Sequence, residues 1–95
     1  MYARISTFHV KPDQLAPFAT AIAIAADQLK RVPGITECKC AVDAEGRGVV
    51  FALYPSPEAA AAASDAIRAV WGGLMGHLAG SPTVGGYAQV TDLLA

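Results

Sequence analysis

The sequence has little charge and no apolar run long enough to cross a bilayer. Charged residues make up 16% of the chain, well below the roughly 25% of typical soluble domains. Seven basic and eight acidic side chains are spread along it and leave a formal net charge of −1, so no cationic patch is expected for nucleic acid or anionic lipid. The apolar stretch 16–26 is shorter than the ~20 residues that a membrane-spanning helix needs. We therefore expect neither a nucleic-acid nor a membrane partner.

Signs of secretion and of metal binding are also scarce. The first ten residues alternate in polarity and lack the charged head and apolar run of a secretory signal, so we expect a cytoplasmic protein. The two cysteines, Cys38 and Cys40, lie two apart in a strand-like segment, which is too far for an ordinary disulfide bridge. Because no other metal-binding side chains cluster with them, we expect reduced thiols and neither a metal nor a cofactor.

Apolar residues, by contrast, are abundant. They make up 54% of the 95 residues, and a chain this short buries only roughly 60–65% of the surface that its unfolded form exposes. We expect one domain spanning residues 1–95. Because one small core cannot hide so much apolar surface, we expect burial between subunits, in a homodimer.

Four segments have strand patterns. Residues 2–10 alternate, residues 35–42 and 48–54 are β-rich and joined by a short polar link that contains Gly46, and residues 83–91 read as a last strand. The link predicts a hairpin between the second and third strands.

Two segments have the three-four apolar spacing of an amphipathic helix. The first runs from Leu15 to Val32, with Asp13 as the expected N-cap and Pro33-Gly34 as the stop. The second starts at Ser56-Pro57-Glu58, a strong capping sequence, and continues to Leu78.

The order of these segments predicts an α+β domain of ferredoxin-like type. The β-α-β-β-α-β order gives a four-stranded antiparallel sheet with both helices on one face. We assign Thr7 and His9 to the helix-facing side. The open face is then expected to carry a semi-polar set that suits a twin sheet, namely Tyr2, Arg4, Phe8, Glu37, Lys39, Val50 and Tyr54. The homodimer is expected to form through this open face.

Three structural joints carry a resemblance to a known family. They are the opening Tyr-Ala-Arg-Ile-Ser-Thr-Phe at 2–8, the Val-Pro-Gly-Ile at 32–35, and the segment from Tyr54 to Glu58 that leads into the second helix. With these joints the chain resembles the dimeric α+β barrel superfamily, and within it the antibiotic-biosynthesis-monooxygenase-like (ABM) domains, over residues 2–92. Such domains include cofactor-independent oxygenases of phenolic polyketide intermediates and haem-degrading enzymes.

The resemblance implies a pocket between helices and sheet. In the family an asparagine on the first strand, and a tryptophan and sometimes a histidine on the second helix, line that pocket. Trp71 and His77 correspond to the tryptophan and the histidine of the second helix. Thr7 stands at the asparagine position, and its hydroxyl lacks the paired donor and acceptor of an amide. In a regular helix, the spacing between Trp71 and His77 places the two side chains on different sides, so they cannot both point into one pocket. A break in the helix would remove this restriction, and the nearby glycines would permit such a break.

Each candidate residue also has a plainer interpretation. His9 and His77 are candidates for acid–base catalysis, although a histidine at a helix end is commonly solvated or capping. Thr7, Trp71 and Tyr87 are candidates for substrate binding, although Trp71 shares a stripe with core residues and a lone strand tyrosine is commonly a packing residue.

Three functions follow as hypotheses. The first is a monooxygenase-like enzyme that holds a small phenolic or polyketide-type substrate between sheet and helices, where a phenolate reacts with oxygen without a metal. The second is a non-catalytic dimeric module that binds a small aromatic ligand or an interaction partner. The third is haem binding or degradation through His77.

Overall fold

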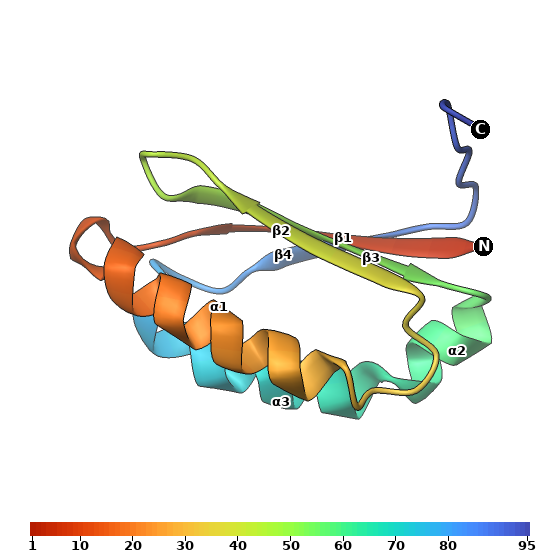
Figure 1. The fold of residues 1–95 in the computed structure, drawn as a ribbon, viewed down its shortest axis with the longest axis horizontal. Helices are drawn as coiled ribbons and strands as arrows, with labels where there is room; N and C mark the ends of the chain where they lie inside the picture. The colour runs from red at the N-terminus through yellow and green to blue at the C-terminus, as the bar shows by residue number, and fades with distance from the viewer.

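The computed structural model describes residues 1–95 as a two-layer α+β fold, with one sheet covered on one face by helices (Figure 1). The sheet has four antiparallel strands in the order β2-β3-β1-β4, which confirms the predicted fold class. The elements in chain order are β1 (Tyr2–His9), η1 (Pro12–Gln14), α1 (Leu15–Leu29), β2 (Glu37–Val42), β3 (Arg47–Tyr54), α2 (Pro57–Ala62), α3 (Ser64–Leu74), η2 (Met75–His77) and β4 (Thr83–Tyr87). No helix has the length and apolar character needed to cross a membrane.

Strand β1 lies inside the sheet, and its alternation decides which side chains face the helices. Phe8 lies 5.5 Å from Phe18 of α1 and 5.7 Å from Trp71 of α3, measured between ring centroids. Because alternate residues of a strand point to the same face, the even-numbered residues of β1 face the helices and the odd-numbered ones face away. The predicted assignment of faces is therefore inverted on β1, and Thr7 and His9 lie on the open face, where both are exposed.

The inversion extends to the strands beside β1. Register pairs Ser6 with Val50 and Tyr2 with Tyr54, so Val50 and Tyr54 also face the helices. Only two residues of the set predicted for the open face, Glu37 and Lys39, lie there. The open face is instead made by Ala3, Ile5, Thr7, His9, Val49, Phe51, Leu53, Thr83, Gly85 and Tyr87, with Glu37, Lys39 and Ala41 at the β2 edge.

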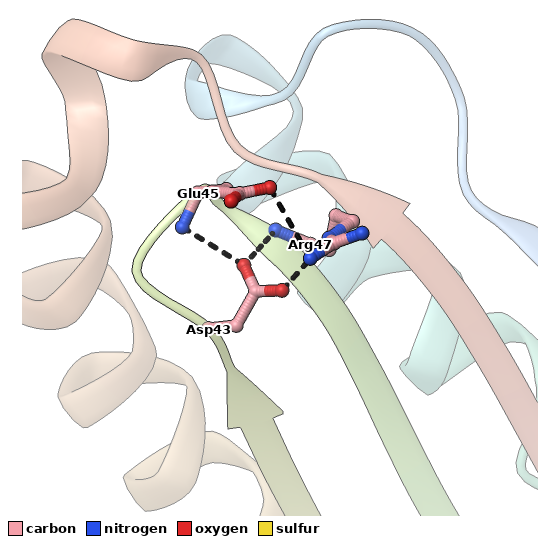
Figure 2. A network of polar contacts seen from close by, with 3 residues as sticks. All are labelled: Asp43, Glu45 and Arg47. Atoms are coloured by element: carbon pink, nitrogen blue, oxygen red, sulfur yellow. Dashed lines mark hydrogen bonds and ion pairs between the residues drawn. The ribbon is translucent and has the colours of Figure 1, made fainter.

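The β2–β3 hairpin is closed by a network at its turn (Figure 2). Asp43 Oδ1 accepts from the backbone N–H groups of Glu45 and Arg47, each at 2.9 Å, and Oδ2 accepts from Arg47 Nε at 2.8 Å. The hydrogen bond from the Arg47 backbone, aided by the guanidinium, lowers the pKa of the Asp43 carboxyl. Gly46 takes a φ of 89°, and its carbonyl accepts from Val10 N at 2.7 Å. The turn is thereby fastened to the end of β1.

The helices confirm one predicted cap and correct another. Ser56 Oγ accepts from Ala59 N at 3.1 Å, with Pro57 at the first helical position, as its sequence predicts. Asp13 is not an N-cap: it lies in the 3₁₀ turn η1, and α1 begins after Gln14 without a side-chain cap. The second helical segment is divided at Ala63 into α2 and α3, and Ser64 Oγ donates back to the Ala60 carbonyl at 3.3 Å beside the break. The last strand ends at Tyr87 instead of Thr91.

Two clusters of buried side chains hold the layers together. The larger contains Phe8, Val10, Phe18, Ala25, Val70, Leu74 and Leu78 and joins β1 to α1 and α3. The smaller contains Ala52, Tyr54, Ala60 and Ala63 and joins β3 to α2 and to the break before α3. Between these clusters the helical layer does not fully cover the sheet, and a cavity remains.

Candidate ligand-binding cavity

The cavity lies between the helix-facing side of the sheet and helices α1 and α3, and its volume is about 670 Å³. Ligand pockets for small molecules typically measure about 300–1,000 Å³ and are lined mostly by apolar side chains. Fifteen of its 22 lining residues are hydrophobic, and the helical wall includes Ile22, Leu29, Ile67, Val70 and Trp71. Its size and lining therefore suit a flat, largely apolar small molecule.

Polar groups are gathered on the sheet side of the cavity. Arg4 and Ser6 come from β1, Cys38 and Cys40 from β2, and Tyr54 from β3. Register places Arg4 opposite Ala52, and Ala52 opposite Cys38. Because these side chains project from paired strands to one face, an apolar ligand under the helices would meet its polar contacts there.

The acidic groups of this sheet side stay protonated at neutral pH. Burial raises the pKa of the Cys38 thiol. Burial also raises the pKa of Cys40, with a further increase from the neighbouring Cys38. Tyr54, which is only 1% exposed, likewise has a pKa raised by burial, although the positive charge of Arg4 opposes the shift. The cavity thus offers neutral thiols and a neutral phenol beside the Arg4 guanidinium.

Trp71 contributes an aromatic wall to the cavity. It is half-buried on α3, and its ring meets Phe8 edge to face at an interplanar angle of 68°. Edge-to-face contacts of this kind hold an aromatic ring in a defined orientation. Trp71 therefore packs on the core through Phe8 and also lines the cavity. The core-packing and the pocket-lining interpretations of this residue are both compatible with the structure.

His77 does not join Trp71 in the cavity. The regular helix ends at Leu74, and His77 lies in the 3₁₀ turn η2, where its ring meets Phe18 at 6.5 Å between centroids. Its Nδ1 lies 2.9 Å from Gln14 Oε1, an acceptor, so this contact requires the proton on Nδ1. The imidazole joins the start of α1 to the end of α3 and does not line the cavity.

The other three predicted site residues lie on the open face. Thr7 pairs with Val49 and Thr83, His9 pairs with Arg47, and Tyr87 pairs with Ala3 and is 50% exposed. None of the three lines the cavity. The structure therefore brings only Trp71, of the five predicted residues, to the cavity, and any catalytic role of His9 or His77 stays a prediction.

Sequence reasoning missed Arg4, Ser6 and Tyr54. The signal that could have found them is that the even-numbered residues of β1 and the residue after it include the large apolar side chains Tyr2, Phe8 and Val10, whereas Ile5 is the only large apolar side chain among the odd-numbered residues. Arg4 obscured that signal, because an arginine is normally expected on a solvated face.

A four-stranded antiparallel sheet with a layer of helices on one face, and a cavity between the two layers, defines a ferredoxin-like α+β fold. Solved structures with this fold cover almost the whole chain. A candidate antibiotic biosynthesis monooxygenase from Caulobacter crescentus is similar at 23% identity and a TM-score of 0.79, over 95% of this chain and 90% of its own.

Two further neighbours come from Nitrosomonas europaea. One, also named as a candidate antibiotic biosynthesis monooxygenase, shares 22% identity at a TM-score of 0.80 and covers 96% of this chain and 100% of its own. The other, a protein of unknown function, shares 18% identity at a TM-score of 0.81 and covers 99% of this chain and 93% of its own. No protein-family model matches the sequence, and no curated protein matches it. At these identities the likeness establishes the fold alone.

Proposed function

We propose that the protein is a cofactor-independent monooxygenase-like enzyme that acts on a small phenolic or polyketide-type substrate held in the cavity. The observation that carries the proposal is the apolar cavity of about 670 Å³ with Trp71 in its wall. An aromatic wall and apolar helices suit a flat ring system, and the polar sheet side suits its oxygen substituents. The names of the Caulobacter crescentus and Nitrosomonas europaea neighbours agree with this choice.

The reaction needs no cofactor besides the substrate and oxygen. An electron-rich ring with an activated methylene loses a proton and gives electrons to O₂. One oxygen atom enters the carbon as a carbonyl, and the other leaves as water with the two methylene hydrogens. The role of the cavity is to hold the ring, to exclude bulk water and to stabilise the anion near Arg4.

Oxygen uptake with anthrone, a ring system with an activated methylene, tests this proposal. The protein should accelerate uptake above the spontaneous rate, and Ile22→Phe, which fills the cavity from α1, should lower the acceleration at least about tenfold. Ile24→Phe is the matched control, because Ile24 lies on the same helix but is 60% exposed. Equal rates in the two variants would place the reaction elsewhere.

Oxygen uptake with anthrone also tests the two histidines. Because neither ring lines the cavity, the double variant His9→Ala, His77→Ala should keep the wild-type rate. A loss of turnover in a folded double variant would restore the acid–base role that their chemistry suggests.

A non-catalytic ligand-binding module is the second candidate. It is favoured by one observation: no carboxylate and no imidazole lines the cavity, so the cavity holds no general base of the usual kind. Ligand binding without oxygen uptake would select this function. Haem binding through His77 has less support, because His77 does not line the cavity, and the absence of a Soret band on titration with haemin would exclude it.

We further propose that two copies associate through the open face. Its centre is apolar, with Ile5 and Phe51 half-buried and Val49 38% exposed, while Glu37 and Lys39 lie at its edge. A central apolar patch with a polar rim is typical of protein interfaces.

Analytical ultracentrifugation tests this association. The protein should sediment as a dimer at micromolar concentration, and Phe51→Glu should sediment as a folded monomer, because a carboxylate would be buried without a partner. Ile24→Glu, which places the same charge on an exposed site of α1, should stay dimeric. A wild-type monomer would contradict the proposed dimer.

A further inference from the structure

Arg4 differs from the other arginines of the chain in having no counter-ion. Arg31, Arg47 and Arg68 pair with Asp27, Asp43 and Asp65 along the chain. Arg4 takes part in none of the ion pairs and in none of the side-chain hydrogen bonds. It is half-buried on the central part of the sheet, where an unpaired charge is unfavourable.

The walls around Arg4 contain no negative charge. No aspartate or glutamate lines the cavity. Two further cationic residues border it: Lys39 projects to the open face and pairs there with Glu37, and Arg68 pairs with Asp65. The thiols and the Tyr54 phenol are held protonated by burial, which raises the pKa of each. An apolar cavity with one uncompensated cation is complementary to a ligand that has an apolar body and one anionic group.

We propose that Arg4 is the anion anchor of this cavity and that its ligand is an aromatic or polycyclic carboxylic acid. The planar guanidinium can donate two parallel N–H bonds to the two oxygens of a carboxylate, a geometry that a lysine does not provide. The ring system lies against Trp71 and the apolar side chains of α1 and α3. The inference rests on the proposed function only in placing the ligand in the same cavity, and it predicts that an added carboxylate makes a ring system bind more tightly there.

Tyr54 supplies a second contact to the same anion. Its side chain is the largest of the fully buried ones, it lines the cavity, and the field of Arg4 acts on its hydroxyl. A protonated phenol beside the guanidinium donates its O–H to a carboxylate oxygen. Arg4 and Tyr54, from β1 and β3, then bind the acid group together on the sheet side.

Binding of a matched pair of ligands tests the inference without reference to turnover. The pair is 2-naphthoate, an anion at pH 7, and 2-naphthamide, a neutral molecule of almost the same shape. Calorimetric titration at low salt gives both affinities, and fluorescence of Trp71, the only tryptophan, reports whether the ligand reaches the cavity. The wild type should bind the naphthoate at least about tenfold more tightly than the amide.

Substitutions of Arg4 should remove that preference. Arg4→Gln should weaken naphthoate at least about tenfold and change amide binding less than about twofold. Arg4→Lys, which keeps the charge without the planar fork, should recover part of the loss. Tyr54→Phe should weaken naphthoate by a smaller factor. Arg31→Gln is the matched control, because it removes the same charge from an exposed site outside the cavity, and both affinities should stay unchanged.

Each outcome decides a different point. Equal binding of the two ligands by the wild type, or a preference that survives Arg4→Gln, overturns the role of Arg4 and leaves the cavity and the proposed function intact. Binding of neither ligand overturns the inference, and the proposed function then stands or falls on oxygen uptake with anthrone. An Arg4-dependent preference in a protein that takes up no oxygen supports the inference and rejects the monooxygenase alone.

Discussion

Phe8→Ala should lower the free energy of unfolding by about 3–5 kcal/mol. The ring is 8% exposed, and it contacts both Phe18 and Trp71. Its removal leaves a void where β1, α1 and α3 meet, and the rigid strands on either side cannot close it. Urea unfolding followed by circular dichroism measures the loss, at one protein concentration for all variants because an associating protein gains stability with concentration.

A milder substitution at the same site provides the comparison. Phe8→Leu keeps a branched apolar side chain in the same place and should lose less than about 1.5 kcal/mol. In both variants Trp71 loses its edge-to-face partner, so its fluorescence should change even where Phe8→Leu stays folded. A loss below 1 kcal/mol for Phe8→Ala would mean that the three elements are joined mainly by other contacts.

Gly48→Ala should destabilise the fold by about 1–3 kcal/mol, although glycine in the middle of a strand is normally less favourable than alanine. Register places Gly48 directly opposite Phe8, and the ring lies over the glycine so closely that an added Cβ would fall 2.2 Å from Phe8 Cζ. Because Phe8 is held by Phe18 and Trp71, it cannot move aside freely.

Gly73→Ala is the control of opposite sign. Gly73 lies within α3, and an added Cβ would meet nothing within 4 Å, so alanine should stabilise the helix by up to about 1 kcal/mol. The double variant Phe8→Leu, Gly48→Ala should lose less than the sum of its single losses, because the smaller side chain frees the space above residue 48. Additive losses would show that the two residues do not compete for that space.

The order and type of the elements could be predicted because they depend on local patterns. Alternation marks the strands, Ser56-Pro57 marks the start of the second helical segment, and the polar link with Gly46 marks the hairpin. These signals lie within a few residues of the feature that they specify. The alanine run 59–63 has high helix propensity, so nothing before the break at Ala63 predicts it, and only Ser64 and Asp65 directly after it are weaker helix formers.

The cavity could not be predicted because it depends on which face of the sheet receives the helices. Alternation in β1 divides its residues into two sets but does not state which set is inside. Arg4 lies in the set that a charged side chain makes look solvated, and the opposite choice places Thr7 and His9 on the helix side. An arginine inside is consistent with the fold only where a cavity separates it from the helical wall, and that space is a property of the packed tertiary structure.

Strand β1 therefore carries two interleaved sets of residues with different partners. Arg4, Ser6 and Phe8 face the cavity, whereas Ile5, Thr7 and His9 face the opposite side. In evolutionary terms, either set can change by substitution while the other is preserved. A one-residue insertion or deletion within the strand would exchange the two sets beyond it at a single step. Ligand preference can therefore change through point substitutions in β1, whereas a change in chain length preserves both faces only in the connections at its ends.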